Sequence, residues 1–187
     1  MEKTNPNDAH VQILHKELGI PESYPRTCGL DFYVDCETLV ESENDVFGRQ
    51  AFMAPDAFAA WQNMQAAAGR DNIELQIVSA FRSVDYQAEL LRKKLGRGDS
   101  IEAILKVNAA PGFSEHHSGC ALDITTPGFE PLEEEFESSP AFTWLCQHAG
   151  NFGFSLSFPR ENTAGIAYEP WHWKYDLRKK HEKKHEK

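Results

Sequence analysis

Residues 114–123 read Ser-Glu-His-His-Ser-Gly-Cys-Ala-Leu-Asp, a stretch that sets imidazoles and a carboxylate around one glycine. A second stretch follows at residues 169–173, which read Glu-Pro-Trp-His-Trp. Together they offer two imidazoles and a carboxylate to bind a metal, and a second carboxylate to act as a base. Three protein ligands, one open position and a nearby proton acceptor are what a hydrolytic zinc site requires.

The first stretch is expected to be a loop that runs into a strand at Gly119, because glycine tolerates the backbone angles of such a turn. Side chains then alternate between two faces of the strand. One face carries Gly119, Ala121 and Asp123, and the other carries Cys120, Leu122 and Ile124. The second set is apolar, so Cys120 is predicted to be a core residue rather than a metal ligand. His116 and His117 remain alternatives, because spacing alone does not separate them.

The second stretch is also expected to be a loop entering a strand. Pro170 disfavours a helical conformation at Glu169, and Trp171 and Trp173 alternate with His172. The imidazole should therefore point away from the face on which the Trp rings pack. Taken alone, the segment would be interpreted as an aromatic core strand with an incidental histidine.

The C-terminal segment contains another metal-binding pattern, since residues 181–185 read His-Glu-Lys-Lys-His and match the helical HExxH motif of zinc proteases. This match lies in the almost wholly charged run 178–187 and has no apolar face to bury. We interpret it as a solvated tail that binds metal only adventitiously.

Composition restricts the class of protein. The 187 residues are 41% hydrophobic and 26% charged, with a formal net charge of −10. This balance favours a globular domain and disfavours a nucleic-acid partner, which would require a basic face. No apolar run is long enough to span a membrane, and residues 1–8 lack the apolar stretch of a secretion signal. We expect a cytoplasmic monomer, or a periplasmic one if a signal peptide has been removed.

The four cysteines, Cys28, Cys36, Cys120 and Cys146, form no CxxC pair, so a cysteine-rich zinc site is not expected. A Cys28–Cys36 bridge would require folding to bring the two thiols together. Without a secretion signal, we expect reduced cysteines.

The pattern of apolar and turn-forming residues predicts short helices interspersed with strands. The expected helices cover 9–18, 55–68, 83–95, 100–107 and 140–150, the last with Phe142, Leu145 and Cys146 facing the core. The expected strands cover 30–34, the residues near 46–47, 74–78, the segment after Gly119, 154–158 and 171–175. An acidic loop is expected at 127–139. We predict one α+β domain over 1–187, with flexible residues 1–9 and a charged tail at 178–187.

Three motifs in order resemble those of the zinc D-Ala-D-Ala carboxypeptidases. Ser114-x-His116-x-x-Gly119-x-Ala121-x-Asp123 is similar to their SxHxxGxAxD signature, and Glu169-x-Trp171-His172 to their ExWH signature. Ser79-Ala80-Phe81-Arg82-Ser83 with Gln87 resembles their SxxRSxxxQ segment. The resemblance covers roughly residues 70–176 and includes vancomycin-resistance carboxypeptidases and dipeptidases and related L,D-carboxypeptidases. Phe81 departs from the pattern, since relatives often have Tyr there.

The resemblance implies a hedgehog/DD-peptidase-like α+β fold, in which helices flank a small antiparallel sheet. It also implies a role for each matching residue. His116, Asp123 and His172 would bind Zn²⁺, which selects His116 over His117. Glu169 would be the catalytic base, Arg82 would stabilise the oxyanion, and Ser114 and Gln87 would contact the peptide.

The implied activity is removal of a C-terminal D-alanine, or another D-amino acid, from peptidoglycan-derived peptides. Alternatives within the fold are a D-Ala-D-Ala dipeptidase and a peptidoglycan endopeptidase. An alternative of another class is a zinc-stabilised binding module without catalysis, which the presence of Glu169 disfavours. Peptide specificity is expected to depend on the loops around 96–113 and 127–140.

Overall fold

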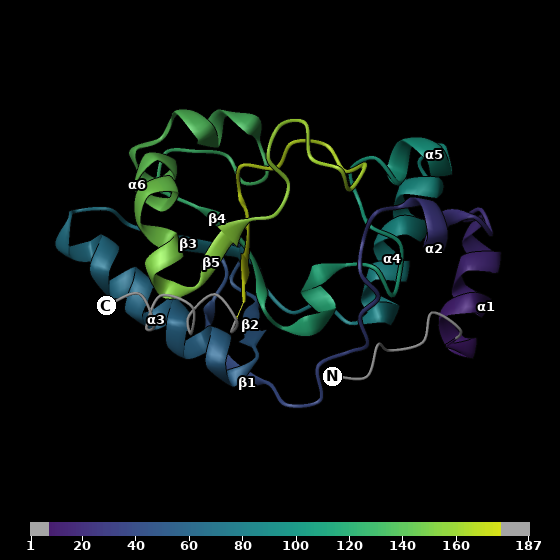
Figure 1. The fold of residues 1–187 in the computed structure, drawn as a ribbon, viewed down its shortest axis with the longest axis horizontal. Helices are drawn as coiled ribbons and strands as arrows, with labels where there is room; N and C mark the ends of the chain where they lie inside the picture. Colours follow the sequence, from purple (N-terminus) through teal and green to yellow (C-terminus); the bar gives the residue numbers. More distant parts are fainter. Residues whose placement is uncertain (1–7, 177–187) are drawn as a thin grey trace.

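A computed structural model describes residues 8–176 of the chain, and Figure 1 shows the order and arrangement of its elements. The helices are α1 (Ala9–Leu18), α2 (Tyr24–Thr27), α3 (Pro55–Arg70), α4 (Val84–Leu95), α5 (Ile101–Ile104) and α6 (Pro140–His148). Three 3-10 turns are η1 (Glu115–Ser118), η2 (Glu134–Ser138) and η3 (Ala149–Phe152). The strands are β1 (Val40–Asn44), β2 (Gln50–Met53), β3 (Gln76–Ser79), β4 (Ala121–Thr125), β5 (Phe154–Leu156) and β6 (His172–Tyr175).

The strands form two small antiparallel sheets. β1 and β2 make a hairpin, while the other strands form a sheet in the order β3-β4-β6-β5. In the larger sheet Ser79 pairs with Asp123, and Asp123 pairs with His172. The expected α+β class with a small antiparallel sheet is therefore confirmed, and its register aligns residues from all three sequence motifs.

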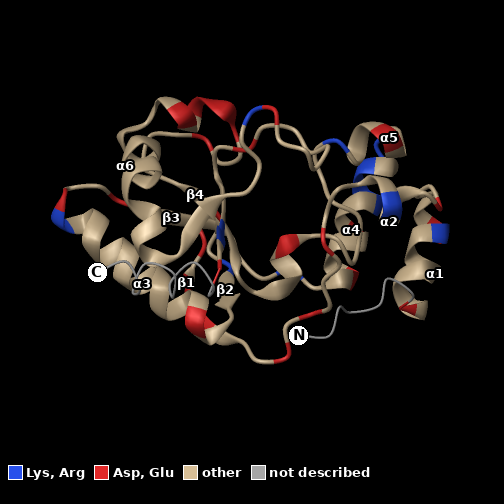
Figure 2. Cartoon of the chain, in the orientation of Figure 1, with Lys and Arg blue, Asp and Glu red and all other residues tan. Residues whose placement is uncertain are grey.

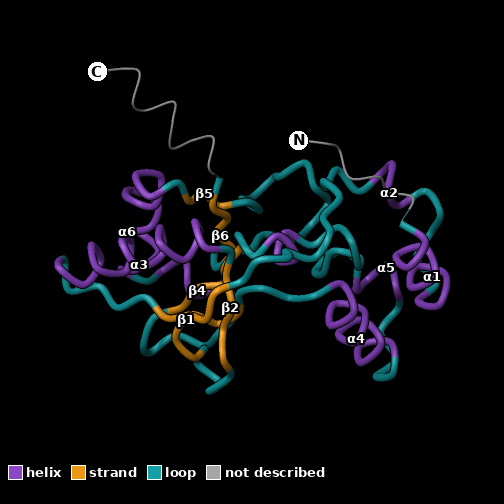
Figure 3. Tube along the Cα trace, turned by 90° about the horizontal axis from the view of Figure 1, so that it is seen from below, coloured by secondary structure: helices purple, strands orange, loops and turns teal. Residues whose placement is uncertain are grey.

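Apolar side chains gather in two buried clusters. One joins the larger sheet to α3 and α6, with Trp61 and Leu145 fully buried. The other joins α1, α2, α4 and α5 around Leu91. Figures 1 and 3 show these helix groups on opposite sides of the strands. Residues 114–119 connect Phe113, in the second cluster, to Leu122, in the first. The first motif is thus anchored in apolar packing at both ends.

Helix boundaries follow capping chemistry in several places. The Asp8 carboxylate accepts hydrogen bonds from the backbone N–H groups of His10 and Val11, so Asp8 is the N-cap of α1, which begins at Ala9. Ser83 caps α4 and Ser100 caps α5 through their hydroxyls. However, α5 ends at Ile104, short of the expected Val107, and α3 continues through Gly69 to Arg70.

Two predicted strands are wrong. Residues 30–34 form no strand, and the backbone N–H of Tyr33 donates to Gly112 O in a loop. Residues 46 and 47 lie in the turn between β1 and β2. There the Asp45 carboxylate accepts the backbone N–H groups of Phe47 and Arg49. An Asp that bonds to the backbone two and four residues on stabilises a turn, which overrides the strand preference of Val and Phe.

The cysteines are all unbridged, and their environments differ. Cys120 packs against the sheet cluster and is only partly buried. Cys146 is exposed on α6, which contradicts its predicted core position. The predicted core residue Leu145 is buried, together with Ala141 and Trp144. The helix is turned so that the large Trp144 ring packs inward, because burying it removes more apolar surface than burying a thiol.

Two further expectations concern the surface and the ends of the chain. Figure 2 shows acidic residues of the 130–137 segment together on and near η2. Phe136 is 1% exposed and anchors this otherwise solvated segment. Among residues 8–176, no helix is long and apolar enough to cross a membrane. The His-Glu-Lys-Lys-His segment at 181–185 lies outside the described residues.

Candidate active site

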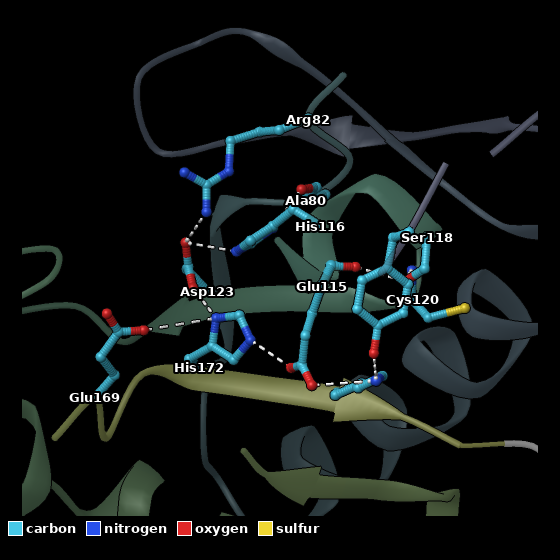
Figure 4. Close-up of polar contacts among 11 residues, drawn as sticks. Ala80, Arg82, Glu115, His116, Ser118, Cys120, Asp123, Glu169 and His172 are labelled. Atoms are coloured by element: carbon cyan, nitrogen blue, oxygen red, sulfur yellow. Dashed lines mark hydrogen bonds and ion pairs between the residues drawn. The ribbon is translucent and has the colours of Figure 1, made fainter. Parts of the chain in front are cut away.

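Two of the predicted ligands face each other across the central strands of the sheet. Asp123 on β4 and His172 on β6 are register partners, and Asp123 Oδ1 lies 3.0 Å from His172 Nδ1. His116 reaches the same point from η1, with its Nε2 3.3 Å from Asp123 Oδ2. All three side chains are buried, and one ligand atom from each lies within 4.8 Å of the others. Figure 4 shows the three side chains converging.

The conformation of Gly119 places His116 in this group. Gly119 ends η1 with a φ of +67°, the left-handed region that favours glycine. Its carbonyl accepts the backbone N–H of Ala54, and a Cβ at this position would lie 2.8 Å from that nitrogen. The prediction that Gly119 turns the chain into the strand is confirmed, and close packing against Ala54 is a second reason for glycine here.

The His116 ring has the tautomer of a metal ligand. Its Nδ1 lies 2.6 Å from the Ala80 carbonyl oxygen, which has no proton to donate, so Nδ1 carries the proton. Nε2 therefore presents a lone pair toward the Asp123 carboxylate, and it is buried without a hydrogen bond. Two acceptors facing each other in a buried site require a cation between or beside them. The donor set of two imidazoles and one carboxylate fits a zinc ion.

The neighbouring His117 has a different environment. Its Nδ1 donates to Arg82 O over 2.7 Å, and its Nε2 accepts the backbone N–H of Gly112 over 3.1 Å. Both ring nitrogens are therefore used in joining the motif to the segments around it. Of the two alternatives that the sequence left open, only His116 has a nitrogen available for a metal.

Glu169 and Arg82 lie on either side of the three buried side chains. Glu169 Oε2 is 3.7 Å from His172 Nδ1, and Arg82 Nη2 is 3.8 Å from Asp123 Oδ2. Glu169 lies in a loop before β6, as Pro170 predicted. The Arg82 Nε is buried without a hydrogen bond. The site thus has a carboxylate and a guanidinium group that its own contacts do not fully satisfy.

Burial and neighbouring charges shift the protonation of these groups in different directions. Burial, strengthened by nearby Arg82, lowers the pKa of His116 to about 4, which keeps its imidazole neutral. Burial alone would raise the pKa of Asp123, but His116 and His172 bring it well below its usual range. Burial also raises the pKa of Glu169, to about 7, against the opposing effects of His172 and Arg82.

A cavity of about 350 Å³ opens over the site. Ser114 and Gln87, the predicted peptide contacts, line it together with the site residues. Gln87 donates its Nε2 to Ala109 O over 2.8 Å, and its Oε1 is buried without a hydrogen bond. Residues 107–109 and 132–134, from the two loops expected to govern specificity, also line the cavity, as do residues 166–168.

Two charged residues of this region were not singled out from the sequence. Lys94, at the end of α4, lines the cavity and donates to Asn108 Oδ1. Glu115 lies between Ser114 and His116, and its Oε2 is 2.9 Å from His172 Nε2. In the sequence Glu115 is one of the variable positions of the SxHxxGxAxD motif. Its contact with His172 appears only in the folded structure.

Comparison with known proteins identifies the family. The family model for VanY D-alanyl-D-alanine carboxypeptidases matches residues 50–177. YodJ, a candidate carboxypeptidase of Bacillus subtilis, is 34% identical over 88% of this chain, which spans 59% of YodJ's length.

Two further proteins are similar. The bifunctional D-Ala-D-Ala dipeptidase and carboxypeptidase VanXYC of Enterococcus gallinarum is 28% identical over 72% of this chain and 70% of its own. The solved LdcB LD-carboxypeptidase has a TM-score of 0.67 and 30% identity, covering 75% of this chain and 69% of its own. The chain belongs to the VanY D-alanyl-D-alanine carboxypeptidase family.

Proposed function

We propose that this chain is a zinc-dependent carboxypeptidase that removes the C-terminal D-alanine, or another D-amino acid, from peptidoglycan-derived peptides. His116, Asp123 and His172 bind the zinc ion, and Glu169 and Arg82 carry the proton transfer and the charge stabilisation. Ser114 and Gln87 contact the peptide. Membership of the VanY family supports the activity and the substrate class.

One observation supports the metal site above the others. The buried Nε2 of His116 has a lone pair, no hydrogen bond and a carboxylate oxygen 3.3 Å away. Leaving a polar atom buried without a partner costs about 1–3 kcal/mol. A bound cation removes that cost and converts the repulsion between two acceptors into two metal–ligand bonds.

The chemistry divides among the residues as follows. Bound zinc supplies a Lewis acid and lowers the pKa of a coordinated water. Glu169 accepts the proton of the attacking water on a carboxylate oxygen and then delivers it to the leaving amine. Arg82 donates hydrogen bonds to the carbonyl oxygen as negative charge grows there. Because burial brings the pKa of Glu169 to about 7, the group can both accept and release a proton near neutrality.

The cavity supports binding of a peptide end. Gln87 Oε1 is a buried acceptor without a hydrogen bond, and Ser114 offers a hydroxyl. The cations Lys94 and Arg82 line the same cavity. These groups suit a chain that ends in an amide and a carboxylate. A second cavity of about 500 Å³ shares Arg82 and Asp123 with the first, which gives the remainder of a peptide room to extend.

The test is a panel of muropeptide tri-, tetra- and pentapeptides incubated with the zinc-loaded protein, with the fragments identified by mass. Loss of one D-alanine from the pentapeptide alone indicates D,D-specificity, and loss from the tetrapeptide indicates L,D-specificity. Release of the dipeptide D-Ala-D-Ala indicates the dipeptidase alternative. No fragment from any peptide, with zinc bound, would contradict the carboxypeptidase proposal and favour the binding module.

A further inference from the structure

Glu115 is a partly buried carboxylate whose two oxygens both have partners. Its Oε2 lies 2.9 Å from His172 Nε2, and its Oε1 lies 3.1 Å from Lys174 Nζ. Its side chain is 12% exposed. Figure 4 shows it on the side of the His172 ring away from Asp123 and Glu169. Glu115 is therefore not a second base with a free oxygen, because both oxygens are engaged.

Both ring nitrogens of His172 face a carboxylate, since Nε2 lies 2.9 Å from Glu115 Oε2 and Nδ1 lies 3.0 Å from Asp123 Oδ1. A carboxylate has only acceptors, so without a metal each of these contacts requires a proton on the ring. Asp123 and His172 belong to the group that could hold a metal, and a zinc ion shared with Asp123 would take the place of the proton on Nδ1. The remaining proton then lies on Nε2 and is donated to Glu115, which holds the ring with Nδ1 toward the metal.

A second set of contacts holds Glu115 in place. Lys174 is two residues beyond His172 on β6, and its Nζ donates both to Glu115 Oε1 and, over 2.5 Å, to the Tyr33 hydroxyl. Tyr33 comes from the segment before β1. Three separate parts of the chain therefore meet behind the metal-binding face of His172.

We propose that Glu115 is a positioning residue that fixes the tautomer and ring orientation of His172 for zinc binding, and that Lys174 and Tyr33 hold Glu115 in that position. The inference rests on the zinc site of the proposed function. Partners that donate or accept at the far nitrogen of a metal-binding histidine change metal affinity by about 10–100-fold when they are removed. The same range is expected here.

The direct test is the tautomer of His172 in the zinc-loaded wild-type protein. Long-range proton–nitrogen correlation of the imidazole, with ¹⁵N-labelled histidine, identifies which ring nitrogen is protonated. We expect the proton on Nε2 and zinc on Nδ1. A proton on Nδ1, with zinc on Nε2, would overturn the proposal without any variant being made.

The second test measures zinc affinity by competition with a chelator of known affinity. Glu115→Gln and Glu115→Ala should bind zinc about 10–100-fold more weakly than the wild type. Tyr33→Phe should cause a smaller loss in the same direction, since it removes one of the two acceptors of Lys174 and leaves Glu115 itself in place. The matched control is Glu133→Gln, which removes the same charge from the same cavity lining at a residue that is exposed; its affinity should equal that of the wild type.

Two failures are distinguishable. If the wild type binds zinc and releases D-alanine, but both Glu115 variants bind zinc as tightly as the wild type, only the role of Glu115 is wrong. If the wild type binds no zinc, the metal site itself is wrong and this inference fails with it. If Glu133→Gln lowers the zinc affinity as much as the Glu115 variants do, the loss is a general effect of charge in the cavity, and the proposed role of Glu115 is wrong.

Discussion

The three carboxylates of the site differ in their surroundings, and these surroundings indicate a different role for each. Asp123 is buried between two imidazoles and is kept ionised by them. Glu115 has both oxygens bound, one to an imidazole and one to an ammonium. Glu169 makes only a 3.7 Å contact with His172, and burial raises its pKa to about 7. Only the last of the three is suited to take up and release a proton during a reaction near neutral pH.

The first prediction concerns Glu169. Glu169→Gln should keep zinc, because Glu169 is outside the ligand group, and should lower kcat by about 10²–10⁴-fold, because the amide cannot accept the proton. The measurements are zinc content by atomic absorption and D-alanine release from the best substrate of the peptide panel. Turnover equal to that of the wild type would remove Glu169 from the role of base.

The sequence predicted the candidate ligands of the site but not the contacts that support them. His116, Asp123 and His172 were assigned by resemblance, and the structure brings them together. From the residues alone, His116 and His117 stayed equivalent, because the difference lies in which nitrogen meets Ala80, Gly112 or Arg82 after folding. Glu115 was not assigned, because its contact with His172 crosses 57 residues of chain and no spacing rule encodes it.

At the scale of elements, the position of His116 relative to Asp123 depends on the backbone conformation of the turn between η1 and β4. Gly119→Ala should destabilise the protein by more than the roughly 1 kcal/mol cost of a left-handed alanine, since its Cβ would also lie 2.8 Å from Ala54 N. The measurement is the free energy of unfolding in urea.

The matched control for this prediction is Gly165→Ala. Gly165 has a similar φ of +72°, but nothing lies within 4 Å of an added Cβ. It therefore isolates the backbone cost from the clash. Equal destabilisation by the two substitutions would show that the close contact with Ala54 adds nothing to the cost of Gly119→Ala.

A second element-scale prediction concerns α2. Burial raises the pKa of Tyr24 from its ordinary value of 10.0 to about 12, against the opposing hydrogen bond from the backbone N–H of Ala110. Because the folded pKa is the higher one, this contribution to stability is fully present below pH 10 and is lost as the pH rises from 10 through 12. The loss is on the order of 2 kcal/mol.

The measurement is the free energy of unfolding between pH 8 and pH 12. It should fall more steeply for the wild type than for Tyr24→Phe, although the variant is less stable at pH 8 because Ala110 N–H loses its acceptor. Tyr86→Phe is the control, since Tyr86 is 41% exposed on α4. Parallel curves for the wild type and Tyr24→Phe would contradict the prediction.

Helices were predicted from the sequence more accurately than strands. Helices with clear caps, such as α1 after Asp8 and α4 after Ser83, were placed to within a residue or two. The hairpin of β1 and β2 was misplaced. β1 is mostly polar and exposed, and β2 alternates between exposed and buried residues over only four positions, too few to stand out in the sequence. Residues 30–34 have the composition of a strand, but no partner strand lies beside them in the described structure.

For the whole molecule, the site is built by segments that come from the two apolar clusters. His116 follows Phe113 of the helical cluster, while Asp123 and His172 project from the sheet. A metal bound by all three connects the two clusters. The assignment of residues 1–187 to one domain stays a prediction, as does the charged tail at 178–187, which lies outside the described residues.

The whole-molecule prediction is that zinc stabilises the fold. Free zinc at 100 times its dissociation constant adds about 2.7 kcal/mol of stability, which corresponds to a rise in Tm of about 5–10 °C for a chain of this size. The measurement is thermal unfolding with zinc and after chelation. Asp123→Asn should abolish the difference. A shift of the same size in that variant would mean that zinc acts elsewhere, for example at His181 and His185.

The most direct measurement of the central claim is a titration of the metal-free protein with zinc, followed by release of D-alanine from a muropeptide. To exclude the C-terminal histidines, the chain carrying His181→Ala and His185→Ala is titrated in parallel. Release should rise linearly and level off at one zinc per chain in both proteins. Full release without zinc, or no release after one equivalent has bound, would contradict a catalytic zinc site formed by His116, Asp123 and His172.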